Sequence, residues 1–301
     1  MRGKAAMQKK LNGTDYVLIL ITLLLAIITI LGISSYGIDK SFMFVNQYGD
    51  SVKIFGNGIY AQDSFFKAPI FIGSDATMLF LVVPLMIYAI IGNINKRTLG
   101  SKLFLIGVLA TVLYYATSMV FGVTYNMAEL LYIALFSLSL FTLITLMINI
   151  NLIKLRKSQK WLLPTKGLRI FLIVSGIALF GIWLMDILPS LFNGKSLTLI
   201  ENYTTEITYA IDMGIISPLM FICLRLLNKK DGLGDVLLAI LLTLCAVMGI
   251  MLPIQTIVQT MAGIVTPLPV IVIKVGVFVV LAAFAVYFDK KLFDNLENRK
   301  A

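Results

Sequence analysis

The sequence contains no histidine, and charged residues are scarce. Of the 301 residues, 13% are charged and 59% are hydrophobic, whereas about 25% of the residues in a typical soluble domain are charged. The absence of histidine removes the commonest metal ligand and the commonest general base. This number of charged residues is too small to give a globule of this size a polar surface. The composition therefore excludes an ordinary soluble protein.

Sequence signs of catalysis are missing as well. Cys223 and Cys245 lie in apolar runs without metal-ligand spacing, and we interpret them as packing residues. The chain has no phosphate-binding GxxxxGK[ST] loop and no nucleophile motif. We therefore predict no catalytic residue, no cofactor and no metal. An intramembrane enzyme that acts on a lipid is the least favoured of three functional classes.

Long hydrophobic runs dominate what is present, and the mean hydropathy is +0.95. About 20 apolar residues suffice for a helix to cross a bilayer core. The sequence therefore predicts an all-α polytopic membrane protein with about eight transmembrane helices. We place them at residues 16–34, 76–94, 103–121, 128–150, 168–193, 206–228, 236–259 and 268–288.

Basic residues predict the orientation of these spans. Twenty Lys and Arg residues lie at the termini and in alternate linkers, whereas the opposite linkers hold only Lys40, Lys53, Lys67 and Lys195. By the positive-inside rule, both termini of this multi-pass protein are then cytoplasmic, in the cell membrane. We expect the first span to be an uncleaved helix and not a signal peptide. This distribution explains the net charge of +10 without nucleic acid as a partner.

Residues 36–74 form the longest segment on the predicted outer side. Two short β-like runs flank Tyr48, Gly49 and Asp50, which predicts a small hairpin. We expect this loop to cover the outer ends of the helices as a lid, since long loops without a core of their own are often functional. The alternative is a loop without a role.

Two stretches of the chain resemble each other, which indicates an internal repeat. The stretches that begin at Pro84 and Pro218 share 6 of 17 residues at an offset of 134. The single membrane domain of residues 1–301 would then contain repeat halves at 1–150 and 151–301. Four helices per half give two parallel repeats, as in some transporters.

Five ionisable residues lie within or at the edge of the predicted spans: Glu129, Asp186, Glu206, Asp212 and Lys274. Asp186, Asp212 and Lys274 share a depth of roughly 9–10 Å below the outer helix ends. Charges inside a membrane usually face one another or a water-filled cavity. We therefore expect Lys274 to pair with Asp186 or Asp212, and the alternative is that its long stem reaches the headgroups.

Some of these acids have simpler interpretations. Asn126 and Glu129 have the spacing of a capping box at a helix start, and Asp75 precedes a span as an N-cap would. Asp186 could serve backbone groups freed near Pro189, and Glu206 could be solvated at a cavity mouth.

Polar side chains at helical spacing extend the candidate site. Tyr114 and Tyr115 belong to a polar face of the third span, Tyr209 precedes Asp212 by three residues, and Gln255 and Gln259 are four residues apart. We predict an outward-facing polar cavity lined by spans three, five, six, seven and eight. Its predicted solute- or ion-binding residues are Asp186, Asp212, Lys274, Glu206, Tyr209, Gln255, Gln259, Tyr114, Tyr115 and Glu129.

Two functional classes fit this pattern best. The first is a transporter or permease for a small solute, ion or proton. The second is a sensor, assembly factor or partner subunit, in which the polar cluster is structural and the outer loop binds a protein or lipid. Membrane lipids, a small solute or ion, and a protein partner or second copy are the partners that these classes imply.

Overall fold

The structure is a computed structural model that describes residues 11–152, 155, 165–197 and 199–297. In these residues, eight helices are long and apolar enough to cross a membrane, so the predicted class of all-α multi-pass membrane protein is confirmed. The spans are α1 (Gly13–Ser34), α2 to α3 (Ala68–Lys96), α4 (Leu99–Gly122), α5 (Glu129–Ile148), α7 (Lys166–Asn193), α8 to α9 (Ile207–Asn228), α10 (Gly232–Met261) and α11 to α12, of which Leu268–Asp294 has the apolar length.

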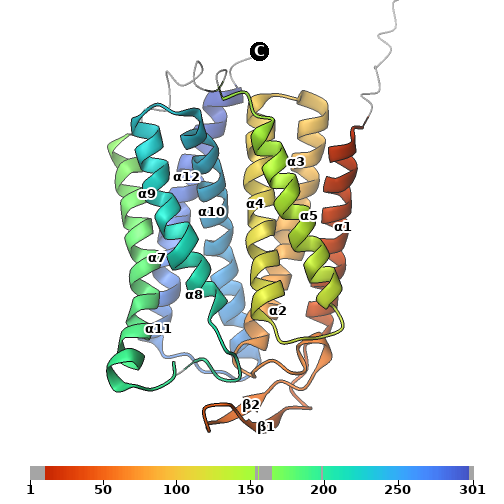
Figure 1. Ribbon diagram of the computed structural model, residues 1–301, viewed down its shortest axis with the longest axis vertical. Coiled ribbons are helices and arrows are strands. Elements are labelled where there is room, and N and C mark those ends of the chain that lie inside the picture. The colour runs from red at the N-terminus through yellow and green to blue at the C-terminus, as the bar shows by residue number, and fades with distance from the viewer. Residues whose placement is uncertain (1–10, 153–154, 156–164, 198, 298–301) are drawn as a thin grey trace, which may run out of the picture.

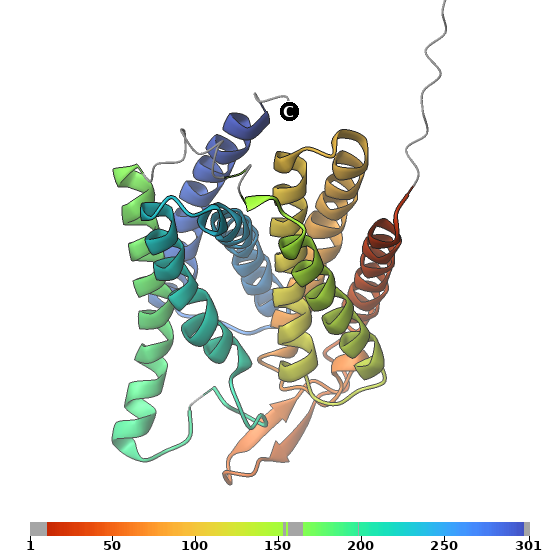
Figure 2. The ribbon, with the colours of Figure 1, turned by 45° about the horizontal axis from the view of Figure 1, so that its top comes forward.

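The helices run side by side, and the connecting segments lie at the two ends of the bundle (Figure 1). Helix α1 begins and α12 ends at the same end of the bundle, which we call the terminal end; the β-hairpin lies at the opposite end, the hairpin end. Helices α4 and α10 are the most buried spans, and α10 packs against α2, α4, α9 and α12 (Figure 2). That the terminal end faces the cytoplasm stays a prediction from the basic residues.

The predicted hairpin is confirmed. Strand β1 (Phe42–Val45) pairs antiparallel with β2 (Ser51–Ile54). In the turn, the side-chain oxygen of Asn46 accepts hydrogen bonds from the backbone N–H groups of Tyr48 and Asp50. A local side-chain bond of this kind favours a turn over continued strand. A short 3-10 helix, Gly58–Tyr60, then leads towards α2.

The lid is shorter than predicted, and the N-cap interpretation of Asp75 was wrong. Helix α2 (Ala68–Thr77) starts at Ala68, with Pro69 in its first turn, where a missing backbone N–H costs nothing. Asp75 therefore lies inside the helix and is fully buried. Its carboxylate accepts hydrogen bonds from the hydroxyl groups of Tyr60 (2.6 Å) and Tyr115 (2.5 Å), so donors from the lid and from α4 satisfy it.

Three spans contain a π-helical segment, which widens the helix locally. The segments are Met78–Val82 before α3 (Val83–Lys96), Asp212–Ile216 between α8 (Ile207–Ile211) and α9 (Ser217–Asn228), and Val272–Gly276 between α11 (Leu268–Ile271) and α12 (Val277–Glu297). The first two are separated by the same offset of 134 residues as Pro84 and Pro218, which follow them. Single π-helical turns are rare in proteins overall, but those that occur are frequently at functional sites. The shared position agrees with two repeat halves, which stay a prediction.

Glycines allow the central helices to approach closely. A Cβ atom on Gly73 of α2 would lie 2.5 Å from the Cα atom of Gln255 in α10. One on Gly107 of α4 would lie 2.5 Å from the hydroxyl oxygen of Thr243 in α10. Small residues at helix interfaces are typical of membrane proteins, because helices there associate through close packing. These two contacts fix α10 between α2 and α4.

We expect Gly73→Ala to destabilise the protein by about 1–3 kcal/mol, because the added methyl group meets backbone atoms that do not move easily. Thermal unfolding of the purified protein measures this as a lower Tm. Gly92→Ala in the same span is the matched control, since a Cβ atom there has no neighbour within 4 Å. Equal Tm values for the two variants would contradict the close approach of α2 and α10.

Candidate functional site

A cavity of about 290 Å³ lies among α2, α4, α7, α8 to α9, α10 and α11 to α12. On α10 its lining extends from Gln259 near the hairpin end to Leu244, a distance of roughly 22 Å at 1.5 Å per residue. Eight of the ten predicted site residues line it: Asp212, Lys274, Glu206, Tyr209, Gln255, Gln259, Tyr114 and Tyr115. Helix α2, which the sequence analysis did not include, adds part of the wall.

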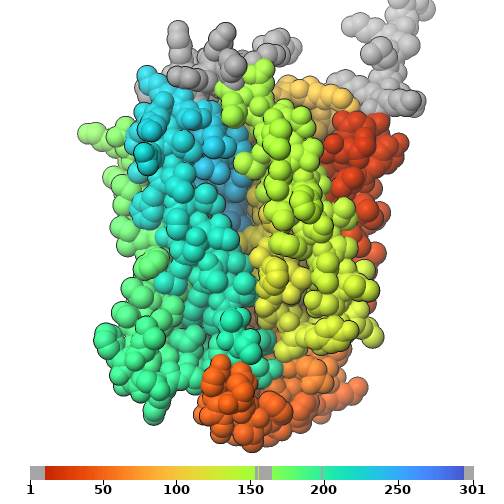
Figure 3. Space-filling view, in the orientation of Figure 1, coloured from red at the N-terminus to blue at the C-terminus, as the bar shows by residue number. Residues whose placement is uncertain are grey.

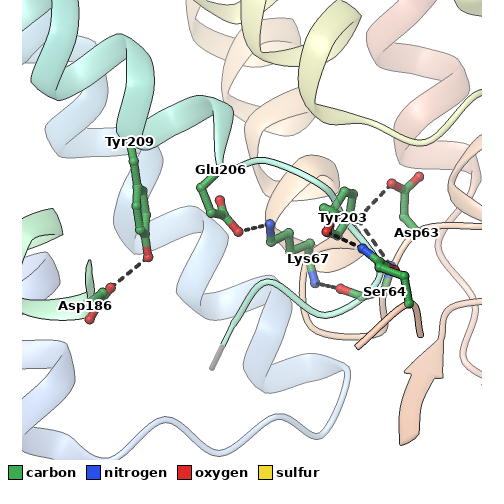
Figure 4. Close-up of polar contacts among 8 residues, drawn as sticks. Asp63, Ser64, Lys67, Asp186, Tyr203, Glu206 and Tyr209 are labelled. Carbon is green, nitrogen blue, oxygen red and sulfur yellow. Dashed lines mark hydrogen bonds and ion pairs between the residues drawn. The ribbon is translucent and has the colours of Figure 1, made fainter. Parts of the chain in front are cut away.

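Lys274 forms an ion pair with Asp186. The distance from Nζ to Oδ2 is 2.6 Å, and the Tyr209 hydroxyl donates to the same oxygen over 2.8 Å; Figure 4 shows the contact between Tyr209 and Asp186. The two charged side chains are 30% and 25% exposed. The lysine thus has a partner in the bundle instead of reaching only for headgroups, and Asp186 takes two side-chain donors. Asp186 itself does not line the cavity.

Asp212 is held in a different way. Its two oxygens accept hydrogen bonds from the Tyr114 hydroxyl (3.0 Å) and from Nε1 of Trp183 (2.9 Å). The Trp183 ring also stacks on the Tyr209 ring, with centroids 4.5 Å apart, and so joins Asp212 to the Lys274 pair. The sequence analysis missed Trp183. Its position three residues before Asp186, on the same helix face, is the signal that would have found it.

Glu206 is not merely solvated at the mouth, because it forms an ion pair with Lys67 (Figure 4). Lys67 is the last residue before α2, and Glu206 the last before α8. The Lys67 ammonium also lies 4.0 Å from the centroid of the Tyr203 ring. Both charged side chains are nearly buried. Lys67, which the sequence analysis did not predict as a site residue, therefore lines the hairpin end of the cavity together with Glu206.

Asp63 joins three segments beside this pair. Its Oδ1 atom accepts hydrogen bonds from the backbone N–H of Thr124 (2.9 Å) and the hydroxyl of Tyr203 (2.8 Å), and Figure 4 shows the Tyr203 contact. Burial raises the pKa of Asp63 to about 7, since water no longer solvates the charged form. The pKa of nearby Glu201 is raised by burial too. The lid, the turn after α4 and the segment before α8 thus meet at one carboxyl group.

The remaining amides and hydroxyl groups bind α2 or the lid. Gln255 donates to the Ser74 hydroxyl (2.8 Å), and Gln259 donates to the backbone oxygen of Phe66 (3.1 Å). Tyr115 borders the cavity while its hydroxyl points to Asp75. These contacts fix one wall of the cavity to α10 and α4.

Glu129 lies outside the cavity lining, and its predicted capping box does not form. The N-cap of α5 is Ala128, without a side-chain cap. Asn126 instead accepts a hydrogen bond from the backbone N–H of Ala128 (2.8 Å). The reason is local: the asparagine side chain closes a turn over two residues before the helix begins.

No family model matches the chain, and neither a curated protein nor a solved structure matches it. Within the described part of the chain, no three His, Cys, Asp or Glu residues are grouped as a metal site. The functional argument therefore depends on the geometry of the cavity.

The raised pKa of Asp63 predicts a pH-dependent stability. An unfolded carboxyl group loses its proton near pH 4, whereas the folded one keeps it up to about pH 7. Its contribution to stability is therefore greatest below pH 4, and falls as pH rises towards 7. We expect the Tm difference between wild type and Asp63→Asn to change between pH 5 and pH 8, because the Tm of wild type should fall more over this range than the Tm of the variant. A difference independent of pH would contradict this.

Removing one charge of the Lys274 pair leaves the other unpaired. We expect Lys274→Met to lower stability by about 1–3 kcal/mol, between the values for exposed and buried pairs. Adding Asp186→Asn should restore most of the loss, because the Tyr209 hydroxyl still finds an acceptor. Thermal unfolding of the two single variants and the double variant gives the coupling free energy. Purely additive effects would show that the pair contributes nothing.

Proposed function

We propose that this multi-pass membrane protein is a transporter or permease whose cavity binds its substrate from the hairpin end. The observation that carries the proposal is the layer of polar groups around the cavity, with the Lys274–Asp186 pair and the hydrogen-bonded Asp212. Charged groups inside a membrane bundle are expensive and usually mark a pathway or binding site. The cavity is lined by residues of both predicted repeat halves, and binding sites in repeat-built transporters lie at such an interface.

The orientation predicted from the basic residues makes this cavity outward-facing. The positive-inside rule assigns the basic linkers of the sequence to the cytoplasm, so the hairpin end would face outside. The lid then covers the outer mouth, and its Lys67–Glu206 and Asp63–Tyr203 contacts hold it closed. Opening those few contacts would admit a substrate.

A sensor or partner subunit is the second candidate, and one observation favours it. All four residues of β1 are apolar and exposed, from 44% for Phe42 to 63% for Val45. An apolar strand with a free edge can take up a strand of another protein. In that case, the lid would bind a partner and the cavity would not open to the other side.

Access to the cavity from both sides separates these candidates. In a background with Cys223→Ala and Cys245→Ala, Met248→Cys places a thiol in the cavity wall. A membrane-impermeant thiol reagent is applied to intact cells and to inverted vesicles. A transporter should expose this thiol on both sides in turn. The matched control is Ile250→Cys on the same helix, whose native side chain is 45% exposed on the bundle surface and should not react.

Reaction from one side alone would contradict transport and support the sensor. Equal reaction of the thiols at positions 248 and 250 would show that the reagent reaches the protein through the lipid. The measurement needs no knowledge of the substrate.

A further inference from the structure

The cavity changes character along its length. Around the hairpin end its wall carries Lys67, Glu206 and Gln259. Beyond Lys274 the wall is formed mostly by Met248, Phe278 and Leu281. Leu281 follows Lys274 by seven residues, about 10 Å along the helix. The space is thus polar at one end and apolar at the other, along the direction of the helices.

Several polar groups of the wall are already paired, whereas the buried Ser175 hydroxyl has no hydrogen-bond partner among the described residues. Both oxygens of Asp212 already accept hydrogen bonds, and Gln255 and Gln259 donate to α2 and the lid. Lys274 differs, because its ammonium group has three N–H donors and one hydrogen-bond partner among the described residues, Asp186, besides the Trp183 ring 5.7 Å away. Its side chain also retains 30% exposure. The donor that can meet a ligand in the middle of the cavity is therefore cationic.

We infer that the ligand of this cavity is a single-chain amphiphile with an anionic headgroup. The headgroup binds the Lys274 ammonium beside the stacked rings of Trp183 and Tyr209, and the chain occupies the apolar part beside Phe278 and Leu281. This deepens the proposed function by naming a substrate class, and so rests on it. The apolar part offers a small polar solute one unpaired group, the Ser175 hydroxyl, and the other polar groups of such a solute would be left unpaired there, which is costly.

The size of the cavity favours one chain over two. Pockets for drug-sized ligands measure about 300–1,000 Å³, and this one has about 290 Å³ over roughly 22 Å of helix. A long and narrow space of this kind accepts one extended chain. The headgroup charge follows from Lys274, because its ammonium group lines the cavity and repels a cationic head, whereas Asp186 lies outside the lining.

Fluorescence of Trp183 gives a direct binding assay. The chain contains two tryptophans, and Trp161→Phe leaves Trp183, in the cavity wall, as the only one. The full chain in phosphatidylcholine nanodiscs is titrated with ω-bromoundecanoate, whose bromine quenches nearby indole. The neutral analogue ω-bromoundecanol is the matched probe. We expect saturable quenching by the anionic probe, at least tenfold tighter than by the alcohol, as one charge-assisted hydrogen bond provides.

Substitutions at the ion pair test the headgroup. Asp186→Asn removes the competing carboxylate, so the anionic probe should bind several-fold more tightly. Lys274→Met with Asp186→Asn should reduce its affinity to that of the alcohol, and a variant that does not fold is recognised by its Tm. Lys195→Met, in the loop after α7, should leave binding unchanged. A merely structural pair predicts weaker binding in Asp186→Asn, which would overturn the inference.

Competition identifies the headgroup and excludes smaller ligands. Unlabelled undecanoate should reverse the quenching if the site takes a carboxylate, and a single-chain lysophosphatidate should do so if it takes a phosphate; either result supports an anionic amphiphile. Reversal by acetate or inorganic phosphate alone would overturn it in favour of a small-anion site. Linear quenching without saturation would show partition into lipid only, and would also overturn it.

The two proposals fail separately. If the thiol at position 248 reacts from both sides while the amphiphile does not bind, the result supports transport and contradicts the proposed substrate class. If the amphiphile binds while that thiol reacts from one side only, the ligand class stands and the protein is a sensor.

Discussion

A carboxyl group inside a helix bundle in lipid must find hydrogen-bond donors, and this constraint organises the hairpin half of the molecule. Asp63, Asp75, Asp186 and Asp212 each accept a hydrogen bond from a tyrosine hydroxyl group. An unpaired charge at such a depth costs at least about 2.5–3.5 kcal/mol. Because acid and tyrosine come from different segments of the fold in all four cases, satisfying the acids also determines how the lid, α4 and α8 pack.

The class of fold could be predicted from the sequence, because it depends on properties that are additive along the chain. Apolar length determines where helices cross a bilayer, and the eight predicted spans overlap the eight observed ones. The Lys274 layer was predictable for a similar reason, since helix geometry converts residue number into depth. What depth does not give is the angle around each helix, so the choice between Asp186 and Asp212 needed the structure.

The parts that escaped prediction depend on contacts between distant segments. The polar residues around Asp75 predicted a helix start. Inside the span, however, the Asp75 carboxylate accepts hydrogen bonds from the hydroxyl groups of Tyr60 and Tyr115. Lys67 resembled an ordinary loop lysine until Glu206, 139 residues further on, was seen to meet it. In Figure 3 a furrow on one face separates the teal surface of α8 to α9 from the lime surface of α5, and such shape is likewise a property of packing alone.

Helix α4 connects these features. Tyr114 and Tyr115 are adjacent, so their side chains point about 100° apart around the helix. One reaches Asp212, the first residue of the π-helical segment in the second predicted half, and the other reaches Asp75, close to the corresponding segment in the first. The two buried acids are therefore held by adjacent residues of one helix, and Tyr60 connects Asp75 to the lid.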